Sequence, residues 1–181
     1  GSIKFNAQEL VGLPDNQMRV LRGDQIAMIF QEPLNSLNPL HSIEKQISEI
    51  LFLHKKMSVA DARERVNELL TLVGLEEAML RLGALPHEFS GGQQQRIMIA
   101  MALANDPDLL IADEPTTALD VTVQAQILKL LKDIQAKLGM AILFITHDLG
   151  IVRNIADRVC VMSNGLIVEQ GDVSQVLDTP S

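Results

Sequence analysis

Two acidic residues, Asp113 and Glu114, follow directly on a short apolar run at residues 109–112. Such a run is typical of a strand that is buried on both faces, and ionised carboxylates at its end are costly unless a cation or a reaction uses them. An aspartate at this place can hold Mg²⁺ through the water shell of the ion, and the glutamate can polarise a water molecule that attacks a phosphate. The alternative is that both acids only cap the turn at Pro115.

A second candidate site precedes a strongly apolar stretch at residues 97–104. Glycines let backbone N–H groups approach a phosphate closely, and a helix that starts there directs its positive end at the anion. A serine adds a hydroxyl donor. The alternative is a Ser-Gly-Gly turn that only caps the helix. The four residues, called the SGGQ segment below, are Ser90, Gly91, Gly92 and Gln93.

Two single polar residues also follow predicted strands. His147 comes just after the apolar run at residues 141–145, which we expect to be a buried strand, and this place suits contact with a γ-phosphate. A lone histidine in such a position is otherwise a structural hydrogen-bonding group. Gln31 follows a strand predicted at residues 25–30, from where its amide can reach a metal ion or an attacking water molecule.

The elements that position these residues fall into two kinds. Short strands are predicted at residues 3–5 and 25–30, and residues 40–105 contain only helices and loops, with Ser42 and Ser58 as helix caps. Strands at residues 109–112 and 141–145 flank a helix that Thr122 opens and Gly139 closes. This strand–helix–strand alternation predicts a parallel sheet with an inserted helical subdomain.

The last part of the chain carries a hairpin pattern. Asn164-Gly165 separates apolar runs at residues 159–162 and 166–168, which predicts an antiparallel hairpin at the edge of the parallel sheet. Cys160, the single cysteine, lies in the first of these runs, so we expect it to be a buried small hydrophobic residue.

The composition excludes several classes of function. The formal net charge is −8, and no run of Lys and Arg interrupts the acidic balance, so no nucleic-acid partner is expected. Five Phe and no Trp or Tyr leave little for stacking bases. The apolar runs are much shorter than the roughly 20 residues that span a bilayer.

Taken in order along the chain, these motifs resemble the ABC-type ATPases. Gln31, the SGGQ segment, Asp113 with Glu114, then Asp120 and His147 are similar to the Q-loop, signature, Walker B, D-loop and H-loop of that family. The stretches at residues 30–39, 86–89 and 113–121 resemble the oligopeptide and dipeptide importer branch in particular. The resemblance covers nearly the whole chain.

The resemblance implies a fold and a domain organisation. The fold is α/β, a P-loop NTPase-like ABC ATPase domain with a parallel sheet core, an inserted helical subdomain and an antiparallel hairpin near the C-terminus. Residues 1–181 would form one partial ABC ATPase domain. Within it, residues 40–105 would be the helical subdomain that carries the signature, and residues 106–181 the Walker B to H-loop core with the hairpin.

The resemblance also implies roles for individual residues in an ATPase that uses ATP and Mg²⁺. Asp113 and Gln31 would serve the metal, while Glu114, His147 and Gln31 would be catalytic. The SGGQ segment and Asp120 would bind nucleotide, with two such domains sandwiching two ATP molecules. The Q-loop and the helical subdomain would receive the transmembrane subunits of a permease, which places the ATPase peripherally on the cytoplasmic face of the membrane, powering import of peptides.

One family feature is missing from residues 1–181. No Gly is followed by Lys, so the phosphate-binding Walker A loop is absent, as is an aromatic residue that would stack on adenine. A deliberate cut, proteolysis and a natural degenerate domain are competing explanations. Gly1-Ser2, typical of a cleaved tag, and the intact Glu114 and His147 favour a cut. We therefore expect residues 1–181 alone to hydrolyse ATP negligibly.

Two alternative functions stay open at this point. One is a soluble ABC ATPase that acts outside transport, although such proteins usually carry long insertions or basic arms that this acidic chain lacks. The other is a non-hydrolysing module that docks a permease through residues 31–53.

Overall fold

The computed structural model describes residues 1–31, 36–117 and 119–178. It divides into two compact units, Gly1–Leu143 and Phe144–Ser181, which are described one at a time. Part of the Q-loop stretch, residues 32–35, lies outside the described residues.

The first unit begins with a small hairpin and a short helix. Strand β1 (Lys4–Phe5) pairs antiparallel with β2 (Gln8–Glu9), and helix α1 (Asp15–Leu21) leads into strand β3 (Ile26–Ile29). The Glu9 carboxylate closes the hairpin by accepting bonds from the Ser2 hydroxyl and from the backbone N–H groups of Ile3 and Val11. These bonds, the one from Ser2 foremost, lower the pKa of Glu9.

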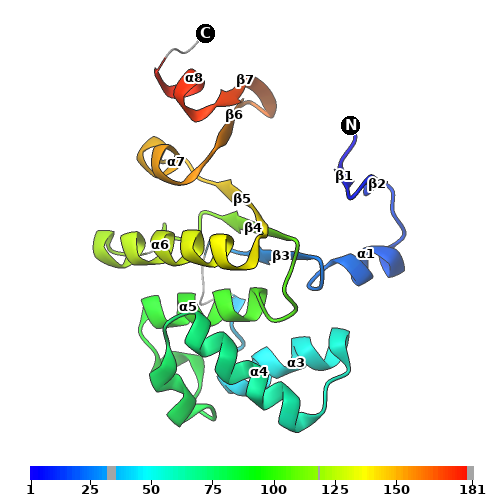
Figure 1. Cartoon of the computed structure of the whole chain (residues 1–181), viewed down its shortest axis with the longest axis vertical. Helices are drawn as coiled ribbons and strands as arrows, with labels where there is room; N and C mark the ends of the chain where they lie inside the picture. Colours follow the sequence, from blue (N-terminus) through cyan, green and yellow to red (C-terminus); the bar gives the residue numbers. More distant parts are fainter. Residues whose placement is uncertain (32–35, 118, 179–181) are drawn as a thin grey trace. The chain divides into compact units, whose positions relative to one another are not determined.

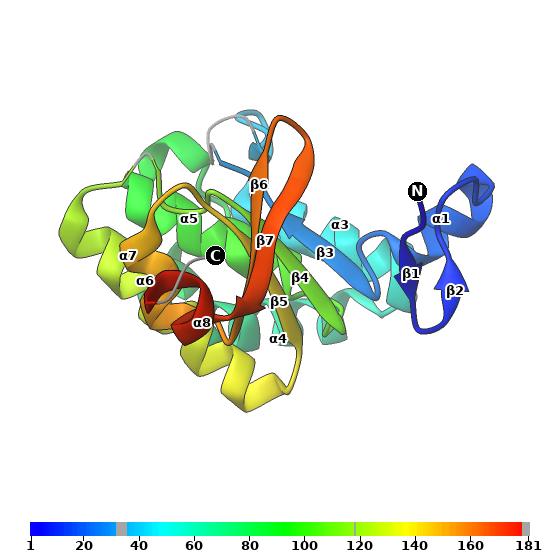
Figure 2. The same ribbon diagram turned by 90° about the horizontal axis from the view of Figure 1, so that it is seen from above.

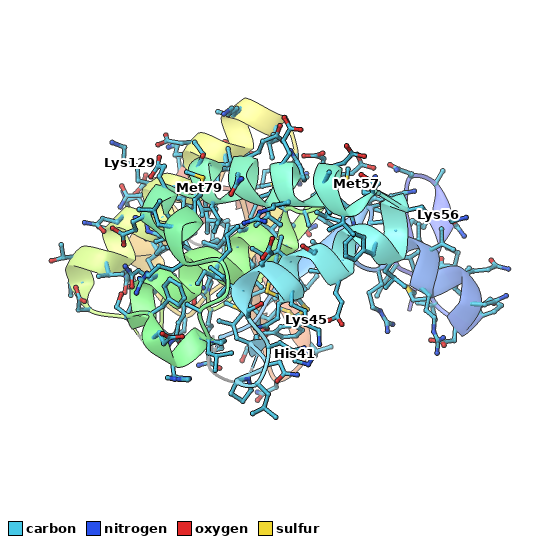
Figure 3. The ribbon with its side chains drawn as sticks, turned by 90° about the horizontal axis from the view of Figure 1, so that it is seen from below. His41, Lys45, Lys56, Met57, Met79 and Lys129 are labelled. Atoms are coloured by element: carbon cyan, nitrogen blue, oxygen red, sulfur yellow. The ribbon has the colours of Figure 1, made fainter. Side chains whose placement is uncertain are left out.

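Between β3 and the next strand, the chain is helical, as predicted. The elements are α3 (Ile43–Lys55), α4 (Val59–Leu72), the short 3₁₀ helices η1 (Glu76–Arg81) and η2 (Pro86–Glu88), and α5 (Gly91–Ala102). Both predicted caps are confirmed, since Ser42 Oγ accepts from Lys45 N–H at 3.3 Å and Ser58 Oγ from Asp61 N–H at 3.2 Å. Figure 3 views this part of the unit, with Lys56 and Met57 at the turn from α3 to α4.

Three helices share one apolar core. Each fully buried large side chain contributes about 1.5–3 kcal/mol relative to exposure, so packing rather than helix propensity holds α3, α4 and α5 together. Figure 1 shows α5 between the other two helices and the strands, and α5 contacts strand β3. Fully buried members of the core include Ile43, Ile47, Leu51, Leu69, Leu70, Ile97 and Ile99.

A parallel sheet positions the candidate site. Strand β4 (Leu109–Asp113), helix α6 (Val121–Leu138) and strand β5 (Ala141–Ile145) follow α5, and the sheet has the order β3-β4-β5 (Figure 2). Strands β3 and β4 pair in parallel from Ile26 opposite Leu109 to Ile29 opposite Ala112. The predicted strand–helix–strand unit and parallel pairing are confirmed.

Strand β5 corrects one expectation, because it is not a buried strand. Its residues alternate between exposed and half-buried, and Leu143 is 52% exposed. Within the described sheet β5 is the last strand in the order, so it has a neighbour on one side only. Helix α6 is closed by Gly139, at φ 69°, as predicted, but its cap is Asp120 and not Thr122.

The second unit contains α7 (Leu149–Ile155), β6 (Arg158–Ser163), β7 (Leu166–Asp172) and α8 (Val173–Asp178). The predicted hairpin is confirmed, with Asn164 at φ 50° and Gly165 at φ 77° in its turn. In the described residues β6 and β7 form a two-stranded sheet of their own, and the expected place of the hairpin at the edge of the parallel sheet stays a prediction. Cys160 is exposed, not buried, because a ribbon of two strands buries little.

The expected boundaries of the helical subdomain (residues 40–105) and of the core that follows it (residues 106–181) stay predictions. Within the described ranges, no helix has both the length and the apolar character needed to cross a membrane.

Candidate functional site

The carboxyl ends of β3 and β4 bring two predicted site residues together. Ile29 and Ala112 are partners in the parallel register, and Gln31 and Glu114 each lie two residues further along. Gln31 Nε2 donates a hydrogen bond to Glu114 Oε2 at 3.1 Å. Because parallel strands end at the same edge of a sheet, this pair occupies the place where ligands bind in α/β proteins.

Glu114 is held in an unusual backbone conformation. Its φ is +44°, in the left-handed region that few residues other than glycine adopt. Such a conformation costs of order 1–3 kcal/mol and persists only where the surroundings enforce it. The turn beyond β4 does so, since Thr117 N–H donates to the Glu114 carbonyl at 3.3 Å and Thr117 Oγ1 donates to Glu114 Oε2 at 2.8 Å.

Asp113 is the final residue of β4 and is half-buried. The strand alternates, so Asp113 lies on the face opposite to the buried Leu110 and Ala112. The Asp113 side chain therefore faces away from the covered side of the sheet, although Asp113 is next to Glu114 in sequence.

The oxygen donors at this edge suit Mg²⁺ bound together with a phosphate. Mg²⁺ usually takes one or two carboxylates and completes its shell with water and substrate oxygens. Asp113, Glu114 and Gln31 offer side-chain oxygens of that kind at adjoining strand ends. Over the described part of the chain, no group of three or more His, Cys, Asp or Glu side chains is arranged to hold a metal ion.

The SGGQ segment caps α5, so the turn interpretation describes what its side chains do here. Ser90 is the N-cap, and its Oγ accepts from Gln93 N–H at 3.4 Å. Gln93 Oε1 accepts from Ser90 N–H at 2.9 Å, and Gln93 Nε2 donates to Glu77. This reciprocal capping box holds the first turn of α5 rigidly. Phosphate binding by the segment stays a prediction.

Gly92 is required by packing between two helices. A Cβ atom at Gly92 would lie 2.8 Å from Cγ1 of Val123, which is in the first turn of α6. A Cβ at Gly91 would meet only Leu119 Cδ2, at an ordinary 4.0 Å. The SGGQ segment and the start of α6 are therefore in direct contact within one chain.

Asp120 is the residue that starts α6. Its Oδ1 accepts from the N–H groups of Thr122 and Val123, both at 3.0 Å. A carboxylate at this end of a helix is also favoured by the helix dipole. Nucleotide binding, the role that the resemblance implies for Asp120, stays a prediction.

His147 lies in the second unit, between β5 and α7, with an exposed side chain. Its neighbour Asp148 caps α7 by accepting from Gly150 N–H at 2.8 Å and Ile151 N–H at 3.3 Å. Contact of His147 with a γ-phosphate stays a prediction.

Two residues that support this site are not predicted from the sequence. Gln94 is buried, and its Nε2 donates to the carbonyl oxygens of Pro86 and Phe89, both at 2.9 Å, which fixes the loop before the SGGQ segment. A glutamine in a helix that is otherwise strongly apolar indicates a side-chain amide with hydrogen-bond partners inside the protein, because buried polar groups need partners. Thr117 is the other, and nothing in its sequence context marks its bond to Glu114.

Comparison with known families and proteins gives the class of protein. The family profile described as "ABC transporter" matches residues 1–117 of the chain. The chain therefore belongs to the ABC transporter family and has the α/β fold of its ATPase domain.

Named relatives point to one branch of that family. The chain is 63% identical over 180 residues to the peptidoglycan transport ATP-binding protein YejF of Agrobacterium fabrum, and 56% identical over 180 residues to the oligopeptide transport ATP-binding protein OppD of Bacillus subtilis. In both cases 99% of this chain is covered. The chain spans 33% of the first relative and 50% of the second.

Solved structures confirm the fold. The ATP-binding cassette MJ0796, in a dimeric post-hydrolysis state bound to ADP and Pi, superposes with a TM-score of 0.82 at 31% identity, over 96% of this chain and 73% of that one. The structure of cbiO1 from Clostridium perfringens, part of the transporter complex cbiONQ, gives the same TM-score and identity over 97% of this chain and 67% of that one.

Proposed function

We propose that this chain is part of an ATP-hydrolysing subunit that powers the import of peptides or related small solutes through a membrane permease. The observation that carries the proposal is the Gln31–Glu114 pair at the carboxyl ends of two adjacent parallel strands, in a member of the ABC transporter family. The oligopeptide transport named for the Bacillus subtilis relative supports the choice of solute.

Glu114 acts as the general base in this proposal. Its carboxylate accepts a proton from the water molecule that attacks the γ-phosphate of ATP, and Gln31, already bonded to that carboxylate, orients the same water molecule. Asp113 and Gln31 would hold Mg²⁺, which when bound neutralises charge on the phosphates. His147 contacts the γ-phosphate.

The partners in this proposal are a second ATPase domain and a permease. The SGGQ segment and Asp120 face nucleotide bound by the second domain, and the dimeric form of the similar cassette MJ0796 supports such pairing. The stretch from Gln31 into α3 receives the transmembrane subunits, so the protein sits peripherally on the cytoplasmic face of the membrane. The transporter complex named for the similar structure of cbiO1 supports this arrangement.

A chimaera tests the proposal. Residues 1–181 would replace the matching stretch of the Bacillus subtilis oligopeptide relative, which supplies the rest of the subunit, and Mg²⁺-dependent ATP hydrolysis would be measured beside the unmodified relative. We expect hydrolysis by the chimaera, and its loss in Asp113→Asn. A chimaera that folds, binds ATP and does not hydrolyse it would contradict the proposal.

Residues 1–181 on their own should hydrolyse ATP negligibly. They contain no Gly-Lys loop, so the backbone N–H groups and the lysine that neutralise phosphate charge are not among them. A turnover rate for the purified 181-residue chain that equals the rate of the chimaera would overturn this expectation.

A further inference from the structure

Two side chains from different segments bond to one oxygen of Glu114. Thr117 Oγ1 donates to Oε2 at 2.8 Å, and Gln31 Nε2 donates to the same atom at 3.1 Å. A hydrogen bond donated to a carboxylate stabilises its charged form and restricts its rotation. The proposed general base therefore accepts one hydrogen bond from a residue that follows β3 and one from a residue that follows β4.

A backbone hydrogen bond holds Thr117 close to Glu114. Its N–H donates to the Glu114 carbonyl at 3.3 Å, so the backbone N–H and the hydroxyl of Thr117 both donate to Glu114. Pro115 and Thr116, which lie between the two, are buried, whereas Thr117 itself is exposed. Because the Thr117 side chain is exposed, packing in the core does not explain why its hydroxyl bonds to Glu114.

Thr117 also stands between Glu114 and the start of α6. Three residues further on, Asp120 caps that helix, and Val123 in its first turn packs against Gly92 of the SGGQ segment. The bond from the Thr117 hydroxyl to the carboxylate therefore comes from the segment that leads into this helix.

We propose that Thr117 is a positioning residue, whose hydroxyl holds the Glu114 carboxylate in place. The inference rests on the proposed function for the role of Glu114 as base, but the bond itself can be measured without any hydrolysis.

The test is a double-mutant cycle on the urea unfolding of the 181-residue chain. Thr117→Val removes the donated bond, so we expect it to lower the unfolding midpoint in the unchanged chain and to have little effect in a Glu114→Ala background, because the bond needs both side chains. Thr117→Ser keeps the hydroxyl and should keep the original midpoint. Thr122→Val, at another exposed threonine with its own N–H bonded to Asp120, is the matched control and should show no dependence on Glu114.

Either of two results overturns the proposal: an effect of Thr117→Val on the unfolding midpoint that is the same with and without the Glu114 carboxylate, or an effect of Thr117→Ser as large as that of Thr117→Val. In the chimaera, Thr117→Val should lower kcat about tenfold or more with KM for ATP little changed, and Thr117→Ser should recover it. Coupling between Thr117 and Glu114 in a protein whose chimaera never hydrolyses ATP would contradict the proposed function and leave the positioning role standing. Hydrolysis that is intact in Thr117→Val would contradict the positioning role alone.

Discussion

Glu114 combines the two properties expected of a residue kept for chemistry. Its carboxylate is bonded by Gln31 and Thr117, and its backbone has a φ of +44° that a residue with a side chain adopts only at a cost. A glycine at this place would adopt the same backbone without strain. The fold therefore accepts strain to place a carboxylate just beyond the end of β4.

The strain gives a prediction about stability. Glu114→Gly and Glu114→Ala both remove the carboxylate, but only glycine relieves the left-handed conformation, so Glu114→Gly should be more stable than Glu114→Ala by about 1 kcal/mol. Urea unfolding of the two variants measures the difference. Asp113→Gly against Asp113→Ala is the control at an ordinary strand position, where glycine should be the less stable one. Equal stability of the two Glu114 variants would argue against a strained backbone.

At this scale the sequence predicted the identity of the paired residues but not their bonding. Gln31 and Glu114 were each assigned to the end of a strand, and the register that sets them side by side is a property of the folded sheet. The bond from Thr117 depends on the backbone of Glu114, and no glycine marks that turn in the sequence. Local pattern cannot reveal a strained residue that the surrounding structure enforces.

Among the elements, the contact between α5 and α6 gives the SGGQ segment a second purpose. The sequence explains its glycines by close approach to a phosphate, whereas the structure requires glycine at position 92 because Val123 occupies the space a Cβ would need. Val123 is far from Gly92 in the chain, so this requirement could not be predicted from the segment alone. The caps of α3 and α4 were predictable, since a cap depends on neighbouring residues.

This contact can be tested by substitution. Gly92→Ala should destabilise the fold by about 1–3 kcal/mol, because the new methyl group overlaps Val123 Cγ1 in a packed interface. Val123→Ala in the same chain should recover most of the loss. Gly91→Ala is the matched control in the same turn of α5, where the nearest atom lies at 4.0 Å. Thermal unfolding compares the variants, and equal midpoints for Gly91→Ala and Gly92→Ala would contradict the packing role.

Strands β5 and β6 show where patterns of apolar residues mislead. Both contain a continuous apolar run, which predicted burial, yet Leu143 is 52% exposed and Cys160 is exposed. An apolar run shows that a strand suits burial, but the number of neighbouring strands and covering helices decides how much is buried. That number is a property of the assembled sheet.

On the scale of the whole molecule, the order of the motifs along the chain identified the family. The acidic composition predicts that the chain has no nucleic-acid partner. The helical insertion and a parallel sheet were predicted from periodicity and alternation, and both are present in the structure. The chain spans only part of the length of its relatives, so the proposed activity belongs to a subunit that combines these residues with others.

The most direct test of the account is Glu114→Gln in the chimaera with the Bacillus subtilis relative. Glutamine keeps the size and the hydrogen-bonding oxygen but cannot take a proton from water. We predict that hydrolysis falls about 10²–10⁴-fold while the Kd for Mg-ATP stays within about threefold, since a general base acts on the chemical step and not on binding. Hydrolysis at an undiminished rate in Glu114→Gln would contradict the central claim that this carboxylate is the base.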